Sequence, residues 1–239
     1  MDIAYERAYH EFELTNWWVK ARRQISLYYL KKFNAKCVLD VGCAAGTMML
    51  TLKEQSFPEV YGIDISERAV EECLKKKLNV FKESAEKTHF KDNFFDALIA
   101  SDVLEHTSSD SETLKEWHRI LKPGGRVLLF VPAFMHLWRS SDEINHHRKR
   151  YSLPEIFVFA KENGFAVKKA SYWNFSLYFP LLVVSSLRNL FKVLSESLKA
   201  VNPVLNSFLY ILMSIENRLI TKGVKFPFGV SCFAILEKL

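Results

Sequence analysis

Residues 38–46 read Val-Leu-Asp-Val-Gly-Cys-Ala-Ala-Gly, and this stretch decides the fold that the chain is expected to adopt. Its apolar start predicts a buried strand, and the acid with two glycines predicts a tight turn. Residues 47–53, Thr-Met-Met-Leu-Thr-Leu-Lys, then predict a helix. A strand, a small-residue turn and a helix N-terminus direct free backbone N–H groups to one point, which suits a nucleotide-like ligand.

Strands and helices are predicted to alternate around this turn. Ser66 is expected to cap the second helix, and Lys122-Pro123-Gly124-Gly125 to end a later helix in a turn. Strands with near-continuous apolar runs are typical of a parallel sheet that is covered on both faces. We therefore expect an α/β fold with a doubly wound, mostly parallel sheet. The predicted strands are Cys37–Val41, Val60–Ile65, Asn79–Phe81, Phe95–Ser101, Arg126–Pro132, Phe165–Ser171 and Val230–Leu236.

Length and composition limit the classes of protein that the chain can belong to. Its 239 residues suit one large α/β domain, with or without an appendage. The net charge of +6 favours acidic partners, such as an anionic membrane surface, although a merely basic soluble protein fits equally well. A nucleic-acid partner rests on charge alone and ranks last, because the [DN]-P-P-[YFW] motif of amino-methylating enzymes is absent.

The cysteines and the N-terminus predict a cytoplasmic protein. Cys37, Cys43, Cys73 and Cys232 form no C-x-x-C pair and no metal-binding spacing, so we expect reduced, buried thiols. The first residues lack an apolar stretch, so no secretory signal is expected.

Asp64 ends the second predicted strand, next to the turn at residues 42–46. A carboxylate at that edge of a doubly wound sheet can accept hydrogen bonds from both hydroxyls of a ribose. The turn reads G-x-x-x-G rather than G-x-G-x-x-G. The spacing therefore favours a single nucleoside over a dinucleotide.

Five motifs in register resemble the class I S-adenosylmethionine-dependent methyltransferases, including the ubiquinone-type and cyclopropane-type small-molecule enzymes. They are DVGCAAG at 40–46, the strand ending at Asp64, Glu-Ser-Ala-Glu at 83–86, DALIASDVLEH at 96–106 and LKPGG at 121–125. The resemblance covers residues 36–171 and implies seven strands, the last of them antiparallel. It also implies S-adenosyl-L-methionine as cofactor and S-adenosyl-L-homocysteine as product.

The resemblance implies a role for each residue of these motifs. Asp40 would help to hold the methionine ammonium, Asp64 would bind the ribose and Ile65 would pack on the adenine. The glycines would let the backbone approach the cofactor. Two positions depart from the usual pattern, since Ala44 replaces a glycine and Ser84 replaces an adenine-binding Asp. The implied cofactor-binding residues are Asp40, Gly42, Cys43, Ala44, Gly46, Asp64, Ile65, Ser84, Ala85, Ser101 and Asp102.

Candidate acceptor-side residues follow the fifth predicted strand. Residues 142–151 resemble a D-x-x-x-x-H-x-[RK]-R-Y signature of a methyltransferase subset associated with lipid and surface-glycan acceptors. In that match His147 is a candidate base, with Arg150 and Tyr151 beside it, and His106 is a second candidate. The alternative is a loop anchor in which Arg150 pairs with Asp142 and Tyr151 packs on the next helix. The histidines show no metal cluster in sequence, so no metal is expected, and methylation at oxygen is preferred.

Both ends of the chain extend this core. Residues 1–35 predict a helical cap, either a cover for the sheet or a lid over the pocket. Residues 36–174 with 228–239 would form the cofactor-binding domain, and 175–227 an apolar helical insert. The insert is too short and too interrupted to span a membrane. It could cover the acceptor, form a homodimer face or lie on a membrane surface.

Two functions remain open at this point. The first is a methyltransferase that acts on a small-molecule or lipid- or glycan-linked acceptor. The second is a catalytically weak S-adenosylmethionine-binding protein of the same fold, which would act as a regulator or partner subunit, because fold does not determine function. The departures at Ala44 and Ser84 keep the second function in view.

Overall fold

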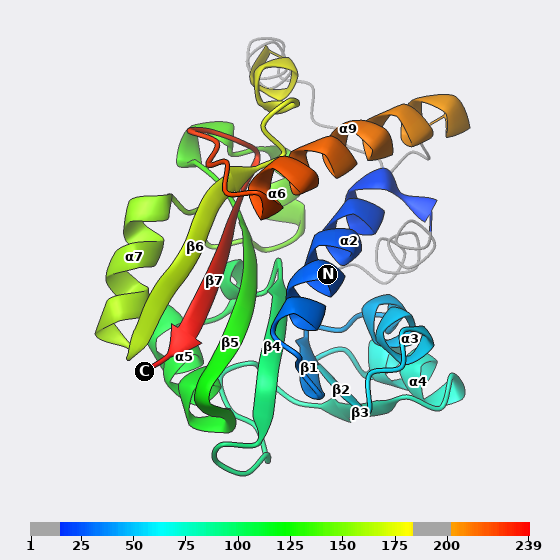
Figure 1. Ribbon diagram of the computed structural model, residues 1–239, viewed down its shortest axis with the longest axis vertical. Coiled ribbons are helices and arrows are strands. Elements are labelled where there is room, and N and C mark those ends of the chain that lie inside the picture. The colour runs from blue at the N-terminus through cyan, green and yellow to red at the C-terminus, as the bar shows by residue number, and fades with distance from the viewer. Residues whose placement is uncertain (1–14, 184–201) are drawn as a thin grey trace.

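Seven strands form one sheet at the centre of the molecule (Figure 1). The computed structural model describes residues 15–183 and 202–239. The sheet has the order β3-β2-β1-β4-β5-β7-β6, and only β7 runs antiparallel to its neighbours. This arrangement confirms the predicted mostly parallel sheet with an antiparallel last strand. The strands are β1 (Cys37–Val41), β2 (Glu59–Asp64), β3 (Asn79–Lys82), β4 (Phe95–Ser101), β5 (Leu121–Pro132), β6 (Phe165–Trp173) and β7 (Ser231–Lys238).

Helices connect these strands and begin at residues suited to capping. The Ser66 side chain accepts a hydrogen bond from the backbone of Ala69, as its predicted N-cap role requires. Ser152 and Glu155 form a capping box at the start of α7. The helices are α2 (Trp17–Lys32), α3 (Thr47–Glu54), α4 (Glu67–Lys75), η1 (Leu104–His106), α5 (Asp110–Ile120), η2 (Met135–Leu137), α6 (Ser140–Ile144), α7 (Leu153–Glu162) and α9 (Pro203–Thr221).

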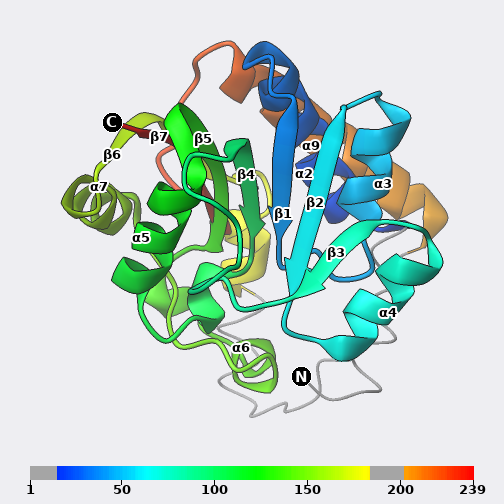
Figure 2. The ribbon, with the colours of Figure 1, turned by 90° about the horizontal axis from the view of Figure 1, so that it is seen from below.

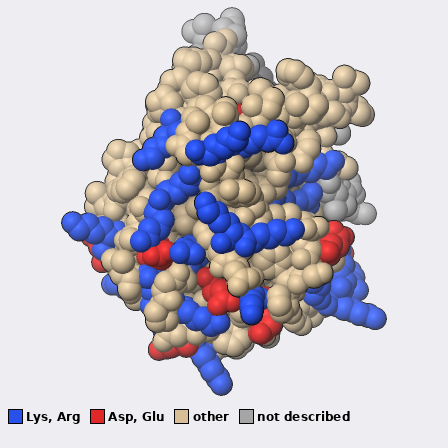
Figure 3. All heavy atoms as spheres, in the orientation of Figure 1, with Lys and Arg blue, Asp and Glu red and all other residues tan. Residues whose placement is uncertain are grey.

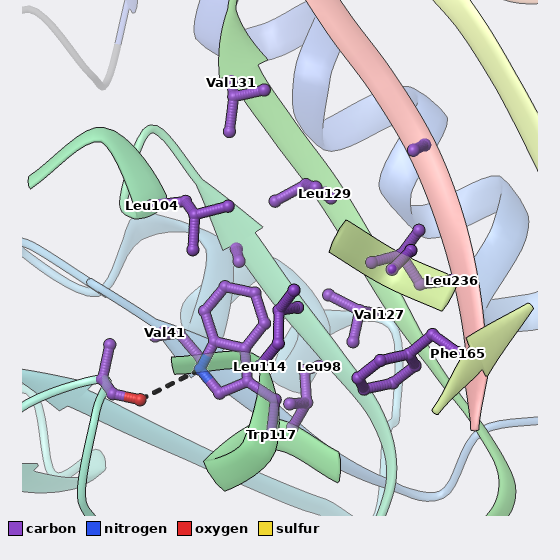
Figure 4. Packing of buried hydrophobic residues seen from close by; sticks show 14 of the residues in the cluster. Val41, Leu98, Leu104, Leu114, Trp117, Val127, Leu129, Val131, Phe165 and Leu236 are labelled. Carbon is purple, nitrogen blue, oxygen red and sulfur yellow. Dashed lines mark hydrogen bonds between the residues drawn. The ribbon is translucent and has the colours of Figure 1, made fainter. Parts of the chain in front are cut away.

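Both faces of the sheet are buried, which explains why the strands are apolar along their whole length. Neighbouring residues on a strand enter different clusters: Val38 joins the face covered by α2, α3 and α9, and Leu39 joins the face covered by α5 and α7. Figure 2 shows these helices on opposite sides of the strands. On the α5 face, Trp117 lies fully buried and donates its indole N–H to the Ala85 carbonyl at 3.1 Å (Figure 4).

Three local predictions differ from the structure. β5 begins at Leu121 instead of Arg126, because Leu121 pairs with Phe95 before the turn loops out and pairing resumes at Arg126. The β6 strand continues past Ser171 to Trp173, since β7 supplies backbone partners along its whole length. The polar segment after β5 was expected to be irregular, yet it contains the short helices η2 and α6.

The predicted cap and insert pack on each other. The described part of the cap is α2 and that of the insert includes α9, and the two helices lie side by side (Figures 1 and 2). The Asn217 side chain of α9 accepts a hydrogen bond from Trp173 and donates one to the Ala21 carbonyl of α2. The predictions for residues 1–14 and 184–201 lie outside the described residues. The division into cap, cofactor-binding domain and insert stays a prediction.

Lys and Arg side chains spread across the middle of the face seen in Figure 3, whereas the end that carries most of α9 shows little charge. Along α9, apolar residues at helical spacing are exposed, including Val204, Phe208, Ile211 and Ile215. Across residues 15–183 and 202–239, no helix has both the length and the apolar character that crossing a membrane requires.

Candidate active site

A cavity of about 1060 Å³ lies at the carboxyl ends of β1, β2 and β4, where a doubly wound sheet binds its ligands. Almost all of the site residues predicted from sequence border it. Gly46 and Tyr151 are absent from its wall. The predicted residues that line the cavity are Asp40, Gly42, Cys43, Ala44, Asp64, Ile65, Ser84, Ala85, Ser101, Asp102, His106, His147 and Arg150.

The turn between β1 and α3 depends on its two glycines. Gly42 has a φ of 68° and Gly46 a φ of 76°, and residues with a side chain rarely adopt this left-handed conformation. A Cβ at Gly42 would lie 2.7 Å from a Val103 methyl, and one at Gly46 would lie 2.4 Å from Leu78. Gly46 therefore acts by letting the turn pack closely, while Gly42 borders the ligand space. Ala44 also has a positive φ, 45°, which a glycine would adopt at lower cost.

Asp64, at the end of β2, binds both the turn that follows β1 and the turn that follows β2. Its Oδ2 accepts a hydrogen bond from the Ala44 N–H at 2.9 Å, and its Oδ1 accepts one from the Ser66 N–H at 2.9 Å. A carboxylate has about four acceptor positions. Asp64 therefore holds both turns and places its carboxylate, a hydrogen-bond acceptor, at the cavity wall.

The parts of the cavity wall that follow β2 and β3 carry apolar and small polar groups. Ile65 is 72% exposed, so an apolar side chain faces open space beside Asp64. Ser84 accepts a hydrogen bond from the Glu86 N–H at 3.2 Å, which orients its hydroxyl at the cavity wall. The Ala85 carbonyl is engaged by Trp117. Ile65 and Ser84 thus place an apolar side chain and a hydroxyl on the wall of the same cavity.

Helix α2 contributes side chains that sequence reasoning did not assign to the site. Arg22 is a basic residue, of a type that is usually exposed, but it is only 9% exposed and lines the cavity. Its guanidinium donates to the Asp102 carboxylate at 2.6 Å and lies 5.1 Å from the Trp18 ring centroid. The spacing from Trp18 to Arg22 is one helical turn, so the sequence did hold a signal for a shared face. α2 thus packs on the sheet and also lines the cavity, and its role as a lid stays a prediction.

On the opposite wall, Asp142 anchors the loop after β5. Arg150 donates to both of its carboxylate oxygens, at 3.0 and 2.8 Å, and to the Ala133 carbonyl. Burial raises the pKa of Asp142, but the hydrogen bonds from His147 and Arg150 outweigh it and hold that pKa at about 2. This is the geometry of the loop-anchor alternative for Arg150, since its guanidinium is committed to the protein.

Tyr151 belongs to the same anchor. Its side chain is fully buried, its hydroxyl donates to Asp110 at 2.8 Å and its ring packs against Phe159 of α7. Burial and the nearby Asp110 raise the pKa of Tyr151 far above its ordinary value. The sequence placed Tyr151 among the reacting groups, whereas its position suits support of the loop.

The two candidate bases meet at the cavity wall. The rings of His106 and His147 lie 4.7 Å apart between centroids in an edge-to-face arrangement. His147 shares a hydrogen bond of 2.8 Å between its Nδ1 and Asp142, which leaves Nε2 for other partners. Burial, followed by the charge of His147, lowers the pKa of His106 to about 4, so its ring is neutral at physiological pH.

Comparison with known proteins agrees with this geometry. Residues 39–129 match the family described as "Methyltransferase domain". Residues 133–151, which carry the histidine of the second loop and its anchor, lie beyond the matched part. The match therefore covers the cofactor side of the cavity and ends before most of the opposite wall.

Two curated relatives and one solved structure illustrate the similarity. The chain is 31% identical to phosphoethanolamine N-methyltransferase 3 of Arabidopsis thaliana over 134 residues, which is 53% of this chain and 27% of that protein. It is 29% identical to a demethylmenaquinone methyltransferase of Geobacillus sp., over 52% of this chain and 59% of the relative. The fold is similar to that of a SAM-dependent methyltransferase from Archaeoglobus fulgidus, with 21% identity, a TM-score of 0.59 and coverage of 96% and 99% of the two chains.

The matched region, the strand order and the cavity together define the class. Residues 39–129 match a methyltransferase domain, and the sheet around them is similar to that of a SAM-dependent methyltransferase. It spans 27% to 59% of the length of the two curated relatives, which act on different acceptors. The family thus implies S-adenosylmethionine as the methyl donor.

Proposed function

We propose that this protein transfers a methyl group from S-adenosylmethionine to a small-molecule acceptor. The observation that carries the proposal is the single cavity wall shared by Gly42, Asp64, Ile65 and Ser84, at the carboxyl edge of the sheet. When bound there, the cofactor would supply a methyl group already activated on a sulfonium. The protein then needs to hold an acceptor in line with that carbon and exclude water.

The residues present fit the cofactor. Gly42 and Val103 line the cavity together, where a Cβ on Gly42 would collide with the Val103 methyl, and the Asp64 carboxylate at the same wall would accept hydrogen bonds from ribose hydroxyls. Ile65 offers an exposed apolar face for adenine, with the Ser84 hydroxyl beside it. Asp40, buried at the end of β1, would receive the ammonium of the methionine part. Ser101 and Asp102 border the same part of the cavity.

The acceptor is proposed to lie against the wall formed by His106 and His147. The neutral imidazole of His106 at the edge of the cavity suits an acceptor oxygen that loses a proton as its bond to carbon forms. Arg150 and Tyr151 would act by positioning this wall, because both are buried and bonded to carboxylates. Methylation at oxygen is therefore our preferred reaction.

A lipid-linked acceptor is the finer proposal for the substrate class. The exposed apolar row of α9 at residues 204, 208, 211 and 215 supports it, because such a row can face a membrane surface. The net charge of +6 would add attraction to anionic headgroups. A homodimer that covers the same row is the competing arrangement, and sedimentation with and without vesicles distinguishes the two.

Cofactor binding is tested most cleanly at Ile65, whose exposed side chain contributes little to folding. Replacing Ile65 by Ser should weaken S-adenosylmethionine binding about tenfold, because burial of such a side chain contributes about 1.5 kcal/mol or more. Asp64→Asn should weaken it further. Leu74→Ser is the matched control, since Leu74 is 55% exposed on α4 and does not line the cavity. Equal calorimetric affinities for the Ile65 and Leu74 variants would contradict the proposed cofactor site.

Methyl transfer is tested with labelled S-adenosylmethionine and extracts separated into lipid and water-soluble fractions. A labelled product in the lipid fraction would support the lipid-linked acceptor, and one in the soluble fraction would assign a free metabolite. Binding of the cofactor without any labelled product would favour the catalytically weak regulatory protein instead. Alkali-labile label would indicate an ester, which distinguishes carboxyl methylation from methylation at a hydroxyl or at nitrogen.

A further inference from the structure

Three potential metal ligands that lie far apart in sequence meet at one wall of the cavity. Glu105 and His106 come from η1 after β4, and His147 comes from the loop after α6. The atoms that the three side chains offer lie within 4.8 Å of one another. The two segments are joined by a hydrogen bond of 2.9 Å from the Arg148 N–H to the Glu105 carbonyl. The cluster is thus a product of the fold, which is why the sequence showed no metal motif.

Glu105 is the unusual member of this cluster. It is 1% exposed, and among the described residues neither of its carboxylate oxygens has a hydrogen-bond partner. The Arg150 guanidinium, whose charge acts on Glu105, is bound by Asp142 through two hydrogen bonds. A buried carboxylate without partners is costly unless a proton or a cation neutralises it. The two imidazoles beside it favour a cation that binds both oxygen and nitrogen.

His147 is held in the orientation that a metal ligand requires. Its Nδ1 is hydrogen-bonded to Asp142 at 2.8 Å, and Asp142 is fixed in turn by Arg150. A carboxylate behind an imidazole is the usual support of a metal-binding histidine, because it fixes the tautomer and the ring plane. The same contact leaves Nε2 of His147 available on the side of His106, whose ring lies 4.7 Å away.

We propose that Glu105, His106 and His147 bind one divalent transition-metal ion, such as Zn²⁺, at the wall of the cofactor cavity. Two imidazoles and a carboxylate form a common zinc-binding set with room for a further ligand, whereas Mg²⁺ and Ca²⁺ prefer oxygen alone. Zinc bonds of about 2.0–2.2 Å require only small rotations from the observed spacing. This replaces the sequence-based expectation that no metal takes part.

The site deepens the proposed function and in that respect rests on it. His106 and His147 line the cavity, while Glu105 closes the site from behind. The remaining coordination position therefore opens towards the acceptor. A hydroxyl or phosphate oxygen of the acceptor would bind there, and a bound cation favours loss of a hydroxyl proton. Binding of the ion itself requires neither the cofactor nor the acceptor.

The test uses the full-length chain, freed of metal with a chelator that is then removed. Titration with Zn²⁺ is followed by calorimetry, and titration with Co²⁺ by visible absorption, which reports nitrogen coordination. We expect one ion per chain. The affinity should fall at least tenfold in Glu105→Gln and in His147→Gln. His136→Gln is the matched control, because His136 is exposed and lies outside the cavity wall, and it should bind as the unchanged chain does.

Glu105→Gln also distinguishes a ligand from a buried structural acid. Without metal, the variant should unfold at the same temperature as the unchanged chain or higher, because it removes a buried charge. With Zn²⁺, only the unchanged chain should gain in unfolding temperature. The absence of a bound ion, or equal affinities in all variants, would overturn the metal site. S-adenosylmethionine titrated into the same metal-free samples separates that outcome from failure of the proposed function.

Discussion

At the scale of single residues, Ala44 is the clearest conflict between local preference and site geometry. Its φ of 45° places a side chain in the left-handed region, and its N–H donates to Asp64. The turn tolerates the methyl group because the side chain is only partly buried. Alanine in place of the usual glycine at position 44 therefore strains the backbone but leaves the ligand space open.

Ala44→Gly should stabilise the protein slightly and preserve cofactor binding. Relief of the left-handed conformation is worth about 1–2 kcal/mol, and the extra freedom of glycine in the unfolded chain offsets about 0.5–1 kcal/mol of it. We expect the free energy of unfolding in urea to rise by about 0.5–1 kcal/mol. A loss of stability together with weaker S-adenosylmethionine binding would show that the Ala44 methyl group contributes contacts that this account omits.

Glu116 is a second single residue of interest, because it makes the stability of the folded protein depend on pH. It accepts hydrogen bonds from Arg119 and from both the N–H and the hydroxyl of Thr88. Burial raises its pKa, but these hydrogen bonds outweigh burial and lower the pKa below its ordinary value. A carboxyl group whose pKa is lower in the folded state stabilises that state above its unfolded pKa, and the contribution is lost as the pH falls through the folded pKa.

Glu116→Gln should therefore destabilise the protein most at neutral pH. The difference in unfolding free energy from the unchanged chain should shrink as the pH falls from the ordinary pKa of glutamate through the lower pKa of the folded state. Denaturant unfolding at several pH values measures this difference. Glu112→Gln on the same helix is the comparison, because Glu112 donates its backbone N–H to the Ser109 hydroxyl and its side chain makes no hydrogen bond or ion pair with the described residues. A difference that does not vary with pH would contradict the ion-pair explanation.

At the scale of elements, the α2–α9 pair determines one side of the cavity. α2 presents Trp18 and Arg22 to the ligand space while Ala21 and Ile25 pack on the sheet. α9 lies beside it and is joined to it through Asn217. A helix from each end of the chain thus forms one cover, and the position of α2 relative to the strands depends on α9.

Asn217→Leu should weaken this cover. Asn217 is 3% exposed, and its loss leaves the indole N–H of Trp173 buried without its 2.8 Å partner. We expect a decrease of about 2–3 kcal/mol in the free energy of unfolding, measured by tryptophan fluorescence in urea. Ser207→Ala is the control, since that hydroxyl bonds only to the Pro203 carbonyl in the same helix. Equal stability of the two variants would show that α2 is held mainly by apolar contacts.

At the scale of the whole molecule, the sheet brings every turn of the site to one edge. Parallel strands β1, β2 and β4 end side by side, so Asp40, Asp64 and Ser101 meet although they come from separate segments. The antiparallel β7 then closes the sheet between β5 and β6. The residue just before β7 also holds the loop after β5 at this edge of the sheet, because the Ala133 N–H donates a hydrogen bond to the Val230 carbonyl.

The sequence alone determined the architecture and the cofactor side. Strand periodicity, the Gly42–Gly46 turn and the acid at Asp64 depend on local rules of backbone conformation and hydrogen bonding, which act over a few residues. Strand ends were less predictable, because pairing partners decide them, as at Leu121 and Trp173.

Only the tertiary structure decided the parts of the cavity wall that come from α2, from η1 and from the loop after α6. Arg22 looks like a surface residue until Asp102 pairs with it, and Glu105 looks ordinary until burial leaves both of its oxygens without a partner in the described part of the chain. Its meeting with His106 and His147 depends on two loops that pack together at long range. Burial, charge compensation and contact between distant segments are properties of the folded chain, which is why no local pattern predicted them.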